Sequence, residues 1–130
     1  MTVFDASAIL AYLADEPGSE TVAAALVHRG AISAVNWAEV LTRLAVAGIS
    51  PDDPAARELV AGPDAPLTVI PFDEPHARET ARLKTATSGV ALSLGDRACL
   101  ALARMRHATV LTTDRAWRSL KLKIKTVVIR

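Results

Sequence analysis

Three aspartates stand where the chain could carry out chemistry. Asp5 follows the short apolar run 2–4 and precedes an alanine-rich helical pattern, and Asp114 follows the apolar run 109–113. Asp96 opens a further helical pattern. Ligands of open α/β sheets bind in the crevice outside the carboxyl ends of the strands. The three carboxylates are therefore expected to converge on one such crevice.

A cluster of this kind would attract a hard cation. Two carboxylates about 4 Å apart repel each other by roughly 4 kcal/mol at an effective dielectric near 20, so they either raise their own pKa values or bind a positive ion. All-oxygen ligands select Mg²⁺, which takes a few carboxylates together with waters and a phosphate oxygen, and Mn²⁺ is expected to substitute. The hydroxyls of Ser7, Thr112 and Thr113 lie next to these acids and could orient them or bond the local backbone.

Each acid taken singly also has a structural interpretation. Asp5 and Asp114 could cap the helices that follow them. Asp96 heads an apolar helical stripe, where an unpaired charge is costly, but an acid in a first turn is also favoured by the helix dipole. The combination favours chemistry more than any one residue does.

A fourth acid, Glu39, is weaker on sequence grounds. Asn36 and Glu39 have the spacing of a capping box, and Glu39 and Arg43 have the i,i+4 spacing of a surface ion pair. Trp37, Leu41 and Leu44 are expected to form the apolar face of this helix. Helical phase therefore gives no reason to place Glu39 in a site.

Strand and helix patterns alternate along the chain and predict how the acids are positioned. Strands are expected near 2–4, 31–35, 67–70, 109–113 and 126–129. Helices are expected at 6–14, 19–28, from 36 to about 47, 52–62, 73–85, from 93 to about 105, and 115–120. This order predicts one domain over 1–130, a three-layer α/β/α sandwich around a central, mostly parallel sheet of about four to five strands.

The composition is that of an ordinary globular domain, with 51% hydrophobic and 22% charged residues. No apolar run approaches the length of a membrane span, and Asp5 interrupts any signal-peptide pattern, so a cytoplasmic protein is expected. The single Cys99 allows no internal disulfide and is expected in the core. His28, His76 and His107 lack metal-ligand spacing and are expected at the surface.

Charge is unevenly distributed along the chain. Residues 104–130 contain eight basic residues and one acidic residue, whereas residues 1–103 contain seven basic and 13 acidic residues. A basic segment beside an acidic cluster suits a polyanion that is attracted and then held near a metal ion. An ordinary solvated face is the alternative.

Four segments, taken in order, resemble the PIN-domain nucleases. They are Val3-Phe4-Asp5-Ala6-Ser7, Ile32-Ser33-Ala34-Val35-Asn36-Trp37-Ala38-Glu39, Leu94-Gly95-Asp96-Arg97-Ala98 and Leu111-Thr112-Thr113-Asp114. Within that family the chain is most similar to the VapC-type toxins of type II toxin–antitoxin pairs. The resemblance extends over the whole chain, and no single segment would be sufficient.

The resemblance implies a four-acid site of Asp5, Glu39, Asp96 and Asp114 that binds one or two Mg²⁺ or Mn²⁺ ions and cleaves RNA endonucleolytically. It also implies a homodimer, a cognate antitoxin that covers the active-site groove, and an RNA substrate such as a transfer or ribosomal RNA. Many relatives carry a further acid where this chain has Ala116-Trp117, so the number of ions stays open.

Basic residues near the acids are candidates to steer the phosphate backbone of RNA: Arg97, Arg115, Lys121 and Lys123. For the lysines, which alternate up to Lys125, an edge strand that discourages aggregation is an equal alternative.

Other classes of protein fit less well. A phospho-receiver module needs an acidic pair near the first strand, where Asp5 stands alone, and a lysine after a late strand. An Asp-x-Asp phosphatase needs a second acid where this chain has Ser7. A nuclease for RNA processing without an antitoxin, and a catalytically idle module that only binds RNA or protein, remain open.

Overall fold

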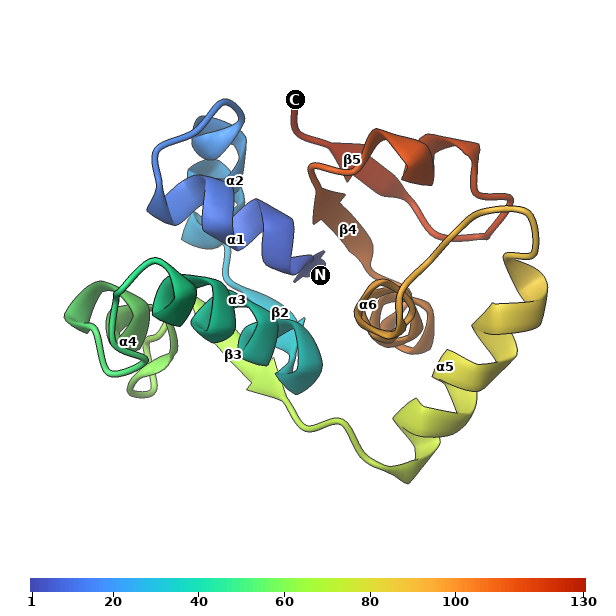
Figure 1. Cartoon of the computed structure of the whole chain (residues 1–130), viewed down its shortest axis with the longest axis horizontal. Helices are drawn as coiled ribbons and strands as arrows, with labels where there is room; N and C mark the ends of the chain where they lie inside the picture. The colour runs from blue at the N-terminus through green and yellow to red at the C-terminus, as the bar shows by residue number, and fades with distance from the viewer.

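The central sheet has five strands, all parallel, in the order β3-β2-β1-β4-β5. A computed structural model describes residues 1–130 (Figure 1). The strands are β1 (Thr2–Phe4), β2 (Gly30–Ser33), β3 (Leu67–Ile70), β4 (Thr109–Thr112) and β5 (Thr126–Val128). The five predicted strands are thus present, and all of them are short.

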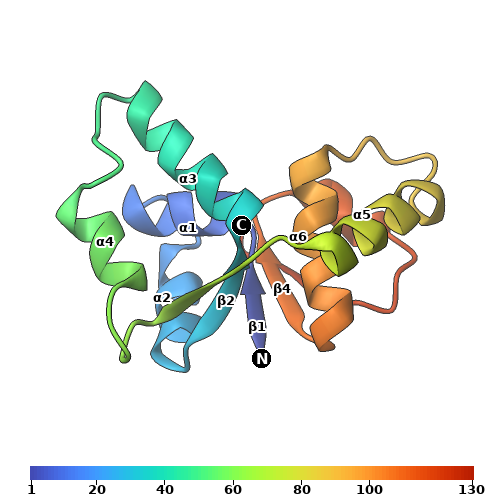
Figure 2. The ribbon, with the colours of Figure 1, turned by 90° about the horizontal axis from the view of Figure 1, so that it is seen from below.

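Helices cover both faces of this sheet. They are α1 (Ala6–Leu13), α2 (Ser19–Val27), α3 (Ala34–Val46), α4 (Pro54–Val60), α5 (Glu74–Ala86), α6 (Leu94–Arg106) and the short 3-10 helix η1 (Arg115–Ser119). Figure 2 shows α1 to α4 on one side of the sheet and α5 and α6 on the other. The predicted three-layer α/β/α sandwich is confirmed.

Side-chain alternation along the strands explains the two outer layers. Successive strand residues point to opposite faces, so Val3 packs with α6 while Phe4 packs with α1, α2 and α3. Both side chains are fully buried. Strands covered on both faces are apolar throughout, which is why short runs such as Thr2–Phe4 carry little polar alternation.

The order of the strands creates the site. β1 lies at the centre, with β2 on one side and β4 on the other, and the chain leaves β1 and β2 towards one face of the sheet and enters β4 from the other. Such a reversal opens a crevice at the carboxyl ends of the central strands. Asp5 directly follows β1, and Asp114 follows β4 at this same edge.

Helix α3 differs from the prediction at its start and in its buried face. The helix begins at Ala34, because the Ser33 hydroxyl accepts a hydrogen bond from the Val35 amide at 3.2 Å and caps it. The expected cap at Asn36 is therefore wrong. The residues of α3 that are fully buried are Asn36 and Val40, so the helix is turned further towards α6 than the apolar pattern predicted.

Two surface predictions are also wrong. His76 is buried at the start of α5, with its ring edge-on to Phe72 at a centroid distance of 6.1 Å, whereas His28 and His107 are exposed. Residues 122–124 form bends and β5 begins only at Thr126, so the alternative of an edge strand for the lysines up to Lys125 is wrong. Cys99 is a fully buried core residue, as predicted. No helix of the chain combines the length and the apolar character needed to cross a bilayer.

Candidate functional site

Four acidic residues from four different segments line one cavity at the carboxyl edge of the sheet. Asp5 comes from the end of β1, Glu39 from α3, Asp96 from the first turn of α6, and Asp114 from the end of β4. The cavity, here called the acidic cavity, has a volume of about 320 Å³. Its other lining residues are Ala6, Ser7, Leu10, Arg43 and Thr113. The three aspartates converge as their positions at strand ends and at a helix start led us to expect.

Asp5 is the buried member of the four. Its Oδ2 accepts hydrogen bonds from the Ser7 hydroxyl at 2.7 Å and from the Thr112 hydroxyl at 2.9 Å. Although Asp5 precedes α1, its side chain makes no capping bond, so the capping interpretation fails here. Burial raises the pKa of Asp5 from 3.8 to about 6. The two hydroxyl donors oppose this shift, and the charges of Asp96 and Glu39 add to it.

Glu39 is held against α6 by a contact between helices. The Asn36 side-chain amide donates to Glu39 Oε1 at 2.8 Å and to the Gly95 carbonyl at 2.9 Å. A Cβ at Gly95 would lie 2.8 Å from Glu39 Cδ, so only glycine leaves room for this carboxylate. The expected surface pair between Glu39 and Arg43 is absent, since no ion pair within 4.0 Å joins them.

Asp96 and Asp114 combine a structural contact with a place in the cavity. Asp96 completes a capping box, in which its Oδ2 accepts from the Ser93 amide at 2.9 Å and its own amide donates to the Ser93 hydroxyl at 3.1 Å. Asp114 Oδ1 accepts from the Ala116 amide at 2.9 Å and caps η1. The capping interpretation is therefore correct for these two acids, and both still line the acidic cavity.

Comparison with protein-family models gives a match to the PIN domain over residues 2–122. The chain belongs to the PIN-domain family. Proteins of this family are generally nucleases, and they typically use divalent metal ions. Comparison with curated proteins found no match.

Solved structures share this fold over nearly the whole length of both chains. A chain from a toxin–antitoxin complex of Klebsiella pneumoniae aligns over 96% of this chain and 99% of its own, with a TM-score of 0.70 and 15% identity. FitAcB from Neisseria gonorrhoeae gives 97% and 96% coverage, a TM-score of 0.66 and 24% identity. DNA-bound VapBC from Salmonella typhimurium gives 97% and 96% coverage, a TM-score of 0.68 and 20% identity. At these identities the likeness shows the fold.

The donor set of this PIN domain fits a hard divalent cation. All four acids offer carboxylate oxygens, and the pKa of Asp5 is raised mainly by burial, with a smaller contribution from the charges of Asp96 and Glu39. No three of these side chains lie close enough together to form a complete set of metal ligands. They surround an open cavity, which suits Mg²⁺ because that ion keeps several of its waters and binds through few carboxylates.

The predicted hydroxyl residues lie where they can support the acids. Ser7 and Thr112 both bind Asp5, and the Ser7 hydroxyl also accepts from the Thr113 amide at 3.0 Å. Thr113 lines the acidic cavity. Together these contacts tie the end of β4 to the start of α1.

The predicted RNA-steering residues lie outside the acidic cavity. Arg97 points from α6 to α5 and donates to the Thr80 carbonyl at 3.0 Å, and Arg115 donates to the Arg130 carbonyl at 3.1 Å. Lys121 and Lys123 are exposed beyond η1. Any contact they make with a long polyanion therefore lies outside the acidic cavity itself.

Three residues at the site were not predicted for it: Asn36, Gly95 and Arg43. Asn36 and Gly95 act through the crossing of α3 over α6, which local sequence does not reveal. Arg43 was assigned to a pair with Glu39 that does not form. Gly95, isolated inside a helical pattern, was the one available signal, because glycine there costs stability unless something needs the space.

Proposed function

We propose that this chain is a metal-dependent endoribonuclease that acts as the toxin of a type II toxin–antitoxin pair and blocks translation by hydrolysing RNA. The observation that carries the proposal is the meeting of Asp5, Glu39, Asp96 and Asp114 in one cavity of a PIN-domain fold. Solved structures of similar fold include a toxin–antitoxin complex and DNA-bound VapBC, which supports the toxin role.

The four carboxylates would hold Mg²⁺, or Mn²⁺ in its place. When bound, such an ion lowers the pKa of a water molecule and neutralises charge on the phosphate in the transition state. The chain itself orients the acids: Ser7 and Thr112 fix Asp5, and Asn36 fixes Glu39. Because each carboxylate is already positioned by a neighbour, less ordering is required when the ion and the substrate bind.

The proposal includes partners. A cognate antitoxin would cover the acidic cavity and suppress cleavage, and two copies of the chain would form the active toxin. The RNA cut would be a transfer or ribosomal RNA, since loss of either stops translation. This assembly follows the resemblance to VapC-type toxins.

The test is cleavage of total cellular RNA by the purified protein with Mg²⁺, with Mn²⁺ and with a chelator. We expect cleavage only with metal. In Asp5→Asn and Asp96→Asn the cleavage rate should fall by more than the roughly 10–100-fold that is typical when a residue supporting a metal ligand is replaced. Equal cleavage by either variant and wild type would refute the site. Cleavage without growth arrest on induction, or with no neighbouring gene that relieves the arrest, would favour an RNA-processing nuclease. Metal-independent arrest without cleavage would favour an idle binding module.

A further inference from the structure

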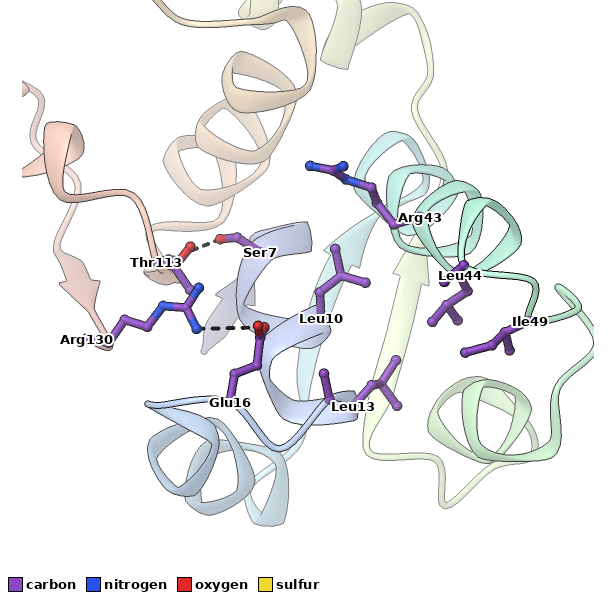
Figure 3. Close-up of a pocket in the computed structure, with 11 residues that line it drawn as sticks. Ser7, Leu10, Leu13, Glu16, Arg43, Leu44, Ile49, Thr113 and Arg130 are labelled. Carbon is purple, nitrogen blue, oxygen red and sulfur yellow. Dashed lines mark hydrogen bonds and ion pairs between the residues drawn. The ribbon is translucent and has the colours of Figure 1, made fainter.

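A second cavity adjoins the acidic cavity between α1 and the end of α3. Its volume is about 520 Å³, and we call it the aliphatic cavity. Its walls are Ser7, Leu10, Leu13, Ala14, Glu16, Arg43, Leu44, Ala47, Ile49, Thr113 and Arg130. Figure 3 shows the leucines and Ile49 along one side of it and the polar side chains at its margins. A nucleoside is well within the size that such a cavity accommodates.

The two cavities are continuous. Ser7, Leu10, Arg43 and Thr113 line both of them. A polymer whose phosphate lies among the four acids therefore has its neighbouring unit at the entrance to the aliphatic cavity. The alternative for that unit is bulk solvent.

Arg43 lies at the junction and is free to bind an anion. Its guanidinium makes no ion pair within 4.0 Å, because the nearest acid on its helix, Glu39, instead accepts from Asn36. Figure 3 shows the side chain reaching from α3 towards the side of the cavity where Ser7 lies. Arg43 is the only basic residue that lines the acidic cavity. An arginine can bind a phosphate through two parallel hydrogen bonds.

We propose that the aliphatic cavity is a nucleoside-binding subsite for the RNA residue next to the scissile phosphate. Arg43, at the junction of the two cavities, binds the phosphate that connects this nucleoside to the part of the RNA in the acidic cavity. This inference rests on the proposed nuclease function and adds a specificity determinant to it. The base would pack on the aliphatic wall formed by Leu10, Leu13 and Leu44. Sequence-specific recognition of RNA depends on unstacked bases of single strands, which such a wall can receive.

The polar margin of the cavity favours a nucleotide over a purely apolar occupant. Arg130 Nη1 lies 3.7 Å from Glu16 Oε1, so the margin presents both donors and acceptors to the edge of a base. A purely apolar protein segment would remove water from this pair and from Arg43 without offering polar partners in its place, which is costly. A nucleotide supplies a phosphate that can bind Arg43 and a base edge that can bind Arg130 and Glu16.

The test combines a filled cavity with a missing base. Binding of short single-stranded RNAs would be measured in the Asp5→Asn background, with each position near the mapped cleavage site replaced in turn by an abasic residue. One abasic position should weaken binding on the order of tenfold. Ala47→Trp, which fills the cavity, should weaken binding of the intact RNA and abolish the effect of that position. Ala14→Leu fills the cavity from α1 and should do the same to a smaller extent.

Val46→Trp is the matched control, because Val46 is 80% exposed and does not line the cavity. It should bind and discriminate RNA as the parent does. Arg43→Gln should weaken binding of all sequences and reduce the salt dependence by about 0.7 in log–log slope, as expected for one lost phosphate contact to a single strand.

Some outcomes would overturn the subsite while leaving the proposed function intact. They are equal sensitivity to abasic positions in Ala47→Trp and the parent, or RNA binding by Ala47→Trp that is unchanged while binding of a protein partner is lost. The latter would make the cavity a protein-docking site. If the wild-type chain neither binds nor cleaves RNA, the proposed function fails, and the subsite fails with it.

Discussion

The Asp5 carboxylate is buried at the end of β1, with both hydroxyl donors on a single oxygen. Burial raises its pKa to about 6. At neutral pH the carboxylate is therefore still charged in the folded chain, although this charge is less stable there than in the solvent-exposed unfolded chain. An asparagine can accept both hydrogen bonds through its Oδ1 and carries no charge. The residue that the proposed site needs most is therefore one that weakens the metal-free fold.

We predict that Asp5→Asn stabilises the metal-free protein at pH 8 by up to about 3 kcal/mol, the equivalent of a shift of about two pKa units. Since the folded pKa lies above the unfolded value of 3.8, the folded state of the wild type binds more protons between 3.8 and about 6, and wild-type stability falls as pH rises through that window. The gain in Asp5→Asn should therefore vanish near pH 4. Urea unfolding at both pH values measures it.

Asp52→Asn is the control for this prediction, because the Asp52 side chain is 86% exposed. It should change stability little at either pH. A gain in Asp5→Asn that persists unchanged at pH 4 would show that burial of the charge is not its cause.

Gly95 gives a second prediction at the scale of a single residue. A methyl group there collides with Glu39, so Gly95→Ala should displace that carboxylate and weaken Mn²⁺ binding by roughly 10–100-fold, the range typical of outer residues. Calorimetric titration measures the affinity. In the Glu39→Ala background, where the collision is removed, Gly95→Ala should cost almost nothing more. An additive double variant would exclude Glu39 as the residue displaced.

Helices α5 and α6 are joined by a charged contact that the proposed site does not use. Glu79 of α5 accepts from Arg104 of α6 at 2.6 Å and from Arg82 at 3.0 Å. Although desolvation would raise the pKa of Glu79, the hydrogen bonds from these arginines, Arg104 first, lower it below 4.5. A lowered pKa means that this contact stabilises the fold above that pH and is lost on acidification.

We predict that Glu79→Gln destabilises the fold by about 1 kcal/mol at pH 7, less at pH 4, and leaves RNA cleavage unchanged. Glu74→Gln is the control, because its pair with Arg78 is exposed on both sides and is expected to contribute only a few tenths of a kcal/mol. Thermal unfolding together with an activity assay separates the two effects. A loss of activity in Glu79→Gln would mean that the packing of α5 on α6 also positions Asp96.

The elements that could be read from sequence are those that local pattern determines. Asp5 and Asp114 follow apolar runs, and Asp96 lies three residues after Ser93, so strand ends and a helix start placed these acids correctly. Glu39 came only from family resemblance, because the face of α3 that meets α6 is defined by Asn36 and Val40. The crossing of α3 over α6 is a feature of the tertiary structure that local sequence does not determine, and the roles of Gly95 and Arg43 follow from it.

At the scale of the whole molecule, stability and the proposed chemistry are separated along the strands. Two core clusters lie on opposite faces of one sheet, and the acids gather at its carboxyl edge outside both clusters. Because both clusters share the same strands, we expect a single cooperative unfolding transition. A chelator should therefore remove activity without unfolding the chain.

This separation leads to a prediction about metal and pH together. An ion that binds only the folded state stabilises it by about 2.7 kcal/mol at a concentration 100 times its Kd, so excess Mn²⁺ should raise the Tm by several degrees at pH 8. At pH 5 the rise should be much smaller, because Asp5, with a pKa of about 6, is then mostly protonated and the ion must displace that proton. Asp5→Asn should show little rise at either pH. If Mn²⁺ raised the wild-type Tm equally at pH 5 and pH 8, the ion would be bound by exposed acids elsewhere on the surface, and Asp5 would not be one of its ligands.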